Sequence, residues 1–200
     1  VVETGRVEAA DAVLAAAAAH VRLDDHPVAH LKFIHRGAHG DHIAGNEVFS
    51  DCEIIACAQT AGHLARHRNA IEIGTYDGPP AISPLVMPTR TFEDRLSLRI
   101  GNTDVELIEF DIHSDDGVVL WLPHTRLLLA GDTLEDSVTY VAEPENLTRH
   151  LPELDRLAKL GATHILPNHG CPDRIAAGGY HAGLIRATAR YVRILLAMKT

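Results

Sequence analysis

Short apolar runs separated by turn residues recur through the second half of the chain. Residues 96–100 and 105–110 flank a Gly-Asn dipeptide, a pattern that predicts two strands joined by a tight turn. Residues 118–122 and 126–130 predict a second pair of this kind. Isolated apolar runs predict three further strands, at 31–34, 53–57 and 163–166.

Apolar residues at helical spacing predict four helices, at 6–22, 60–69, 146–160 and 180–198. Asn146 is expected to cap the third of these helices, and Gly161 to stop it. This mixture, with the later strands arranged as hairpins, predicts an α/β protein with mixed sheets. Because no repeat or linker interrupts the pattern, we expect one domain over residues 1–200.

The least regular stretch is 71–90, which contains four prolines and two glycines. It is predicted to be a long surface loop that contributes to a binding site. Tyr76 and Met87 are its candidate contacts with a ligand, and the alternative is that both side chains only pack the loop down.

Composition excludes some classes of partner. The chain has 200 residues, 46% of them hydrophobic, which is enough for one sizeable core. Its formal net charge of -9 disfavours general binding to nucleic acid, which requires clustered Lys and Arg, and disfavours anionic membrane surfaces. No apolar run reaches membrane-spanning length. We expect no nucleic acid or membrane partner, and the oligomeric state stays open.

The cysteines favour a reducing compartment. Cys52, Cys57 and Cys171 are odd in number, so they cannot all pair within one chain, and no C-x-x-C is present. They are interpreted as buried or half-exposed thiols, and the expected location is the cytoplasm.

Histidines and aspartates cluster in four segments, each directly after a predicted strand. Loops at strand ends are common sites of binding groups, and imidazole with carboxylate suits zinc, iron or manganese. Each segment alone is typical of an ordinary polar loop, but the ordered combination favours a metal site. The candidate ligands are His39, Asp41, His42, His113, Asp132 and His169.

With these residues, the sequence resembles the metallo-β-lactamase superfamily. That family has a His-x-His-x-Asp-His motif after a strand, then a lone His, an Asp and a late His. Here the motif region is 37–42, and the lone His, the Asp and the late His are His113, Asp132 and His169. The resemblance covers nearly the whole chain and implies a four-layer αββα sandwich with metals at one edge of the two sheets.

The sequence departs from the family pattern in two respects. Gly37 stands where the motif has its first His, and His35 lies two positions too early to replace it. The family's leading strands also have no counterpart before Glu3-Thr4-Gly5, so the resemblance leaves two alternatives: an N-terminally truncated first sheet, or a first sheet of which part is supplied otherwise.

The resemblance implies two metal positions that share Asp132. The first retains only His39 and His113, whereas the second retains Asp41, His42 and His169. Because a catalytic zinc site normally has three protein ligands, we expect one tightly held ion at the second position. Zinc is the expected metal, as one or two ions, with iron or manganese as alternatives.

The resemblance implies a metal-dependent hydrolase acting on a small molecule through an ester, thioester, lactone, amide or phosphoester bond. Its candidate catalytic residues are Asp41, which together with Asp132 orients the water and can take up its proton, and His39 or His113, which is free to act as general base. A metal-poor pseudoenzyme or binding module on the same fold is the main alternative. A di-iron redox protein and a nucleic-acid-processing enzyme fit less well.

Overall fold

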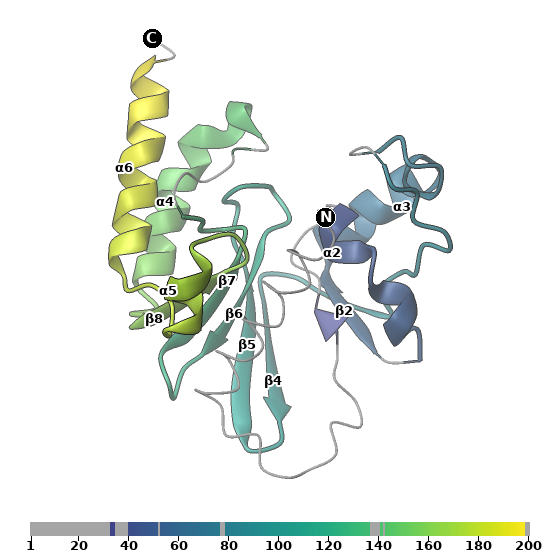
Figure 1. The fold of residues 1–200 in the computed structure, drawn as a ribbon, viewed down its shortest axis with the longest axis horizontal. Coiled ribbons are helices and arrows are strands. Elements are labelled where there is room, and N and C mark those ends of the chain that lie inside the picture. The colour runs from purple at the N-terminus through teal and green to yellow at the C-terminus, as the bar shows by residue number, and fades with distance from the viewer. Residues whose placement is uncertain are drawn as a thin grey trace. The chain divides into compact units, whose positions relative to one another are not determined.

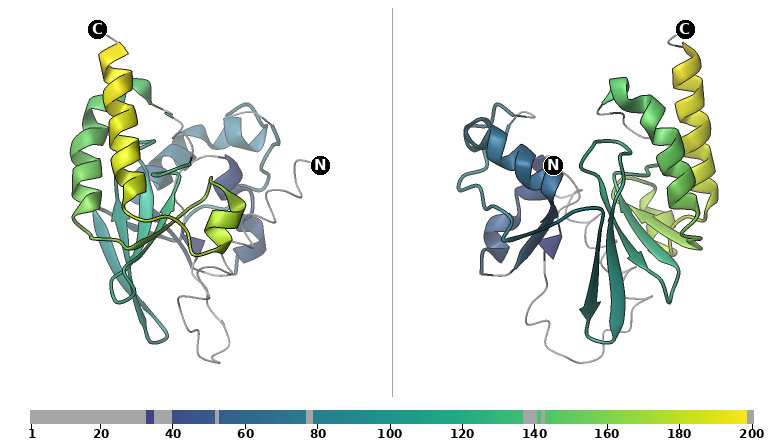
Figure 2. Two further views of the ribbon diagram at one scale, coloured as in Figure 1. Left: turned by 60° about the vertical axis from the view of Figure 1, so that its left-hand side comes forward. Right: turned by 180° about the vertical axis from the view of Figure 1, so that it is seen from behind.

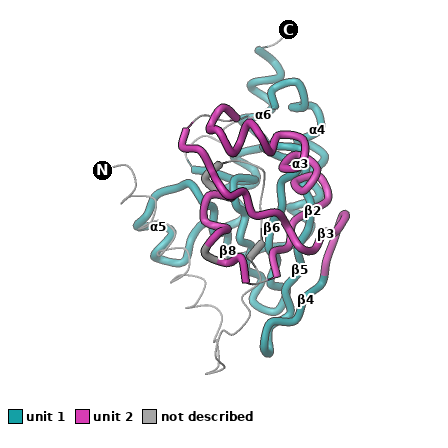
Figure 3. The backbone as a smooth tube through the Cα atoms, turned by 90° about the vertical axis from the view of Figure 1, so that its right-hand side faces the viewer, with its two compact units in different colours: residues 1–25, 97–200 teal, residues 26–96 magenta. Residues whose placement is uncertain are grey.

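The structure is a computed structural model that describes residues 33–34, 40–51, 53–76, 79–136, 141 and 143–198. The predicted helix at 6–22 lies outside the described residues, and so do Gly37 and His39. The chain divides into two compact units, one that includes Ser97–Thr200 and one formed by His26–Leu96 (Figure 3). The prediction of a single domain stays a prediction.

The unit formed by His26–Leu96 contains a small parallel sheet. Its strands are β1 (Phe33–Ile34), β2 (Ile54–Cys57) and β3 (Arg90–Phe92), in the order β1-β2-β3. All four residues of β2 are buried, in agreement with its continuous apolar sequence. Its helices are α2 (Gly40–Ile43), a 3-10 helix (Asn46–Phe49) and α3 (Ala58–Glu72).

Tyr76 and Met87 belong to the core of this unit. Both are partly buried against a cluster of buried apolar residues formed by Ile43, Leu64, Ile71 and Leu85. Tyr76 also stacks on His67, with ring centroids 4.5 Å apart. These contacts support the alternative in which the two side chains pack the irregular segment down. The segment itself begins later than expected, because α3 continues to Glu72.

The other unit contains a five-stranded sheet in the order β4-β5-β6-β7-β8 (Figure 1). Strands β5, β6 and β7 pair antiparallel, and β8 joins β7 in parallel. The two predicted hairpins are present within two residues of their expected bounds. The strands are β4 (Arg95–Ile100), β5 (Thr103–Glu109), β6 (Val118–Leu122), β7 (Leu127–Gly131) and β8 (His164–Pro167).

Helices α4 (Leu147–Ala158) and α6 (Gly183–Met198) pack together on one side of this sheet (Figures 1 and 2). Asn146 is at the N-cap of α4 as predicted, but its side chain donates to Glu143 instead of capping the helix. Gly161 has a φ of 71°, which a glycine adopts without strain after a helix end. The short helix α5 (Pro172–Ala176) was not predicted. None of the described helices is long and apolar enough to cross a membrane.

Candidate metal centre

The directions of three strands bring three predicted ligands to one edge of the five-stranded sheet. Strand β8 runs parallel to β7, and β5 also runs in the direction of β7, since each pairs antiparallel with β6. The carboxyl ends of β5, β7 and β8 therefore lie at the same edge. Asp132 directly follows β7, His169 comes two residues after β8, and His113 comes four residues after β5.

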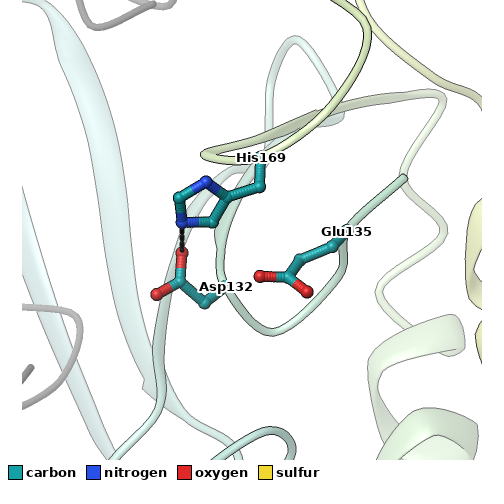
Figure 4. A group of neighbouring side chains, drawn as sticks. All are labelled: Asp132, Glu135 and His169. Atoms are coloured by element: carbon teal, nitrogen blue, oxygen red, sulfur yellow. Dashed lines mark ion pairs between the residues drawn. The ribbon is translucent and has the colours of Figure 1, made fainter. Parts of the chain in front are cut away.

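Asp132 and His169 contact each other at this edge (Figure 4). Nε2 of His169 lies 3.4 Å from Oδ1 of Asp132. The Asp132 side chain is 7% exposed, whereas the His169 side chain is 54% exposed. Nδ2 of Asn168 donates to the same Asp132 oxygen at 3.1 Å, so the carboxylate is held from the His169 loop. A buried, oriented carboxylate beside a solvent-facing imidazole is suited to binding a cation from solution.

The backbone fixes the two loops that carry these side chains. Asn168 N donates to Gly131 O at 3.0 Å, and Asp136 N donates to His169 O at 3.2 Å. These bonds extend the parallel pairing of β7 and β8 beyond the strands themselves. The positions of Asp132 and His169 are therefore set by the main chain as well as by their own contact.

Glu135 adds a third potential metal-ligating side chain beside Asp132 and His169. One potential ligand atom each from Asp132, Glu135 and His169 lies within 4.8 Å of the others. The Glu135 carboxylate points toward the other two side chains (Figure 4), and the residue is 7% exposed. The sequence pattern did not predict Glu135 as a ligand, although Glu135 follows Asp132 by three residues in the same loop.

His113 lies in a tightly closed loop and is not a member of this group of three. It is buried and has a φ of 73°, in the left-handed region that a non-glycine residue rarely adopts. Phe110 N donates to Gly117 O at 2.9 Å to close the loop. A Cβ atom on Gly117 would lie 2.7 Å from Phe110 O, so the loop closes this tightly only with glycine there.

The remaining predicted ligands belong to the other unit, or lie outside the described residues. Asp41 and His42 are in α2, so this part of the motif is a helix and not the loop that was predicted. His42 is half-buried, and the side chain of Asp41 is not described. Gly37 and His39 lie outside the described residues. The assignment of these positions as ligands stays a prediction.

The residues at the sheet edge fit a divalent cation. Ligand atoms about 2.0–2.2 Å from a tetrahedral ion lie roughly 3.4 Å from one another, and Asp132 and His169 are separated by 3.4 Å. The donor set of carboxylate oxygens and an imidazole nitrogen is one that zinc, iron and manganese accept.

Comparison with solved structures decides the fold. A metallo-β-lactamase from Pontibacter korlensis superposes with a TM-score of 0.60 at 19% identity, covering 82% of this chain and 69% of its own. The chain has the metallo-β-lactamase fold. The metallo-β-lactamase IND-7 matches it with a TM-score of 0.57 at 20% identity over 80% of this chain and 66% of its own. The metallo-β-lactamase DIM-1 gives 0.58 at 19% identity over 80% and 68%.

These similarities concern the metallo-β-lactamase fold alone. The chain spans about two thirds of the length of the proteins that it matches. No family model matches the sequence, and no curated protein does. The predicted fold class is confirmed as a mixed α/β metallo-β-lactamase fold.

Proposed function

We propose that this protein is a metal-dependent hydrolase that acts on a small molecule. The observation that carries the proposal is the contact between Asp132 and His169, 3.4 Å apart. Two strands of a metallo-β-lactamase fold end side by side at this contact, and their loops are hydrogen-bonded to each other. An aspartate and a histidine placed in this way form the beginning of a metal-ligand set.

The full ligand set in this proposal includes residues from the sequence motif. The sequence resemblance implies that Asp41 and His42 join Asp132 and His169 as the ligands of one tightly held ion. His39 and His113 are ligands of a weaker second position, which Gly37 leaves incomplete. Zinc is the metal we favour, with iron or manganese as alternatives.

The chemistry divides between the ion and the protein. When bound, a divalent cation would supply a Lewis acid and would lower the pKa of a coordinated water to about 7. Asp132, held by Asn168, keeps its carboxylate in one orientation. Asp41 orients the attacking water in this proposal, and His39 or His113 accepts its proton as general base. His169 is half-exposed and faces the solvent from which a substrate would arrive.

The bond that is cleaved is an ester, thioester, lactone, amide or phosphoester bond. The net charge of -9 argues against a nucleic acid substrate, for which clustered basic residues are needed. We place the protein in the cytoplasm, because Cys171 is a free and exposed thiol that a reducing compartment would preserve.

The test combines elemental analysis with a panel of substrates for these five bond types. The wild-type protein, loaded with Zn²⁺ and dialysed, should retain about one equivalent and hydrolyse at least one class, as expected for a single zinc site. Asp132→Asn should lose both the metal and the activity. Asp155→Asn is the matched control, because it makes the same change at an exposed position of α4. A wild-type protein that binds no metal would refute the proposal.

A metal-poor binding module on the same fold is the second candidate, and Gly37 is the observation that favours it. Elemental analysis distinguishes the two candidates, because the hydrolase should retain metal after loading and the binding module should not. Substrate binding without turnover, in protein that retains no metal after loading, would establish the module.

A further inference from the structure

Glu135 is a buried carboxylate that the ligand set described above does not use. It is 7% exposed, and its carboxylate points toward Asp132 and His169 (Figure 4). Ligand atoms of the three residues lie within 4.8 Å of one another. The side chain therefore reaches the same small volume as the two proposed ligands that contact each other.

We propose that Glu135 is a further protein ligand of the metal, contributed by this chain in addition to the motif residues. This inference rests on the proposed function, because it assumes that a metal binds at Asp132 and His169. It gives this sheet edge three ligands of its own, two carboxylates and one imidazole.

Backbone hydrogen bonds hold the main chain on both sides of Glu135. Thr133 N donates to Ala130 O at 3.1 Å, which turns the chain directly after β7. Asp136 N donates to His169 O at 3.2 Å, which ties the residue after Glu135 to the opposite loop. Glu135 lies between these two fixed points, so its main chain is held beside the centre toward which its carboxylate points (Figure 4).

Charge supports the same assignment. Asp132 and Glu135 are 6% and 7% exposed, and burying two carboxylates close together is costly when both are ionised. A bound divalent cation would compensate two negative charges. Together with the buried position, this favours a ligand role for Glu135.

The proposal also predicts for which metal ion the Glu135 carboxylate raises the binding affinity most. Carboxylate oxygens suit Mn²⁺ better than imidazole nitrogens do, whereas zinc accepts both. The Glu135 carboxylate should therefore matter more for the affinity of Mn²⁺ than for the affinity of Zn²⁺. A side chain that only supported the fold would affect both ions to the same extent.

Calorimetric titration of the metal-free full chain with Zn²⁺ and with Mn²⁺ tests the inference. Glu135→Gln keeps the size of the side chain but removes its charge, and it should weaken Zn²⁺ binding at least about 10-fold, the smallest effect typical of residues around a metal. The loss should be larger for Mn²⁺. Glu145→Gln makes the same change at an exposed position of the same unit and should bind both metals as wild type does.

Asp132→Asn distinguishes a failure of the role of Glu135 from a failure of the metal centre itself. Unchanged affinity in Glu135→Gln, together with weakened binding in Asp132→Asn, would overturn the role of Glu135 and leave the proposed metal centre intact. Unchanged affinity in both variants would overturn both proposals.

Glu135→His provides a measurement that does not depend on Glu135→Gln folding well. An imidazole can replace a carboxylate as a ligand, so this variant should bind Co²⁺ with a shifted visible absorption spectrum relative to the wild type. A spectrum identical to that of wild type would show that residue 135 does not contact the metal, and the proposal would be wrong.

Discussion

The hydroxyl group of Tyr180 joins the two loops of the candidate metal centre through Asp136. It donates to Oδ2 of Asp136 at 2.7 Å and accepts a hydrogen bond from Cys171 N at 2.8 Å. Asp136 directly follows Glu135, and Cys171 lies two residues after His169. Burial is the main cause of the raised pKa of Tyr180, and its hydrogen bond to Asp136 adds to the shift. The phenol therefore stays neutral and holds both loops at ordinary pH.

Tyr180→Phe should loosen both loops without removing a ligand. Losing these hydrogen bonds should lower the free energy of unfolding by about 1 kcal/mol. Zn²⁺ affinity should fall roughly 10-fold, as for other residues that orient metal ligands. Thermal unfolding and calorimetry measure the two effects. Tyr191→Phe removes a hydroxyl from α6 and is the control. Equal Zn²⁺ affinity in Tyr180→Phe and wild type would show that the tyrosine does not position the centre.

Gly117→Ala should distort the loop that carries His113. The added methyl group would lie 2.7 Å from Phe110 O and 3.1 Å from Ile112 O, which are backbone atoms that cannot move away cheaply. We expect a loss of about 1–3 kcal/mol in the free energy of unfolding, as for other overpacked sites. Chemical denaturation measures this loss.

Gly45→Ala is the control for this substitution, because nothing lies within 4 Å of the added methyl group and its φ is −84°. Equal stability of Gly117→Ala and the wild type would mean that the loop closes less tightly than described.

The sequence predicted the parts of the centre that directly follow long apolar strands. Asp132 and His169 follow β7 and β8, whose apolar runs were recognisable without the structure. Glu135 was missed because its neighbours in the sequence do not indicate which way its side chain points. Its place beside His169 depends on the pairing of two loops far apart in the chain, which the hydrogen bond from Asp136 N to His169 O joins.

The elements that the sequence did not predict are short. Strand β3 has three residues, and only Phe92 among them is buried, so its apolar pattern is too brief to recognise. Helix α5 has five residues and begins at Pro172, and a proline at this position is equally typical of a turn. The N-cap position of α4 was correct at Asn146, but the side chain bonds to Glu143 because an additional 3-10 turn, Pro144–Asn146, precedes the helix.

His150 should make the protein less stable in mild acid. It is buried in α4, and its Nε2 has no hydrogen-bond partner among the described residues. Burial lowers its pKa from the ordinary value of 6.5, and the negative charge of Asp111 offsets part of that effect. Arg149 pairs with the same carboxylate at 3.0 Å.

The sign of the effect follows from proton binding. The unfolded chain binds a proton at His150 near pH 6.5, whereas the folded chain binds it only at lower pH. The stability contributed by neutral His150 is therefore complete above about pH 6.5 and is lost as the pH falls through the folded pKa. His150→Gln stays neutral, so its melting temperature should fall less than that of the wild type between neutral pH and mild acid. Parallel melting curves for the two proteins across this range would contradict the prediction.

Gly37→His tests whether this position marks a lost ligand. If the motif's first histidine has been replaced by Gly37, the variant should restore a third imidazole beside His39 and His113. Because ligand number largely decides whether a zinc site forms, it should bind a second equivalent of Zn²⁺ more tightly than the wild type does. The alternative is that the backbone requires glycine at residue 37, in which case the imidazole would lower stability without adding metal. Calorimetric titration of both metal-free proteins distinguishes these outcomes, with thermal unfolding as the check on folding. A variant that folds normally and takes up no additional zinc would show that Gly37 is not a vacant ligand position.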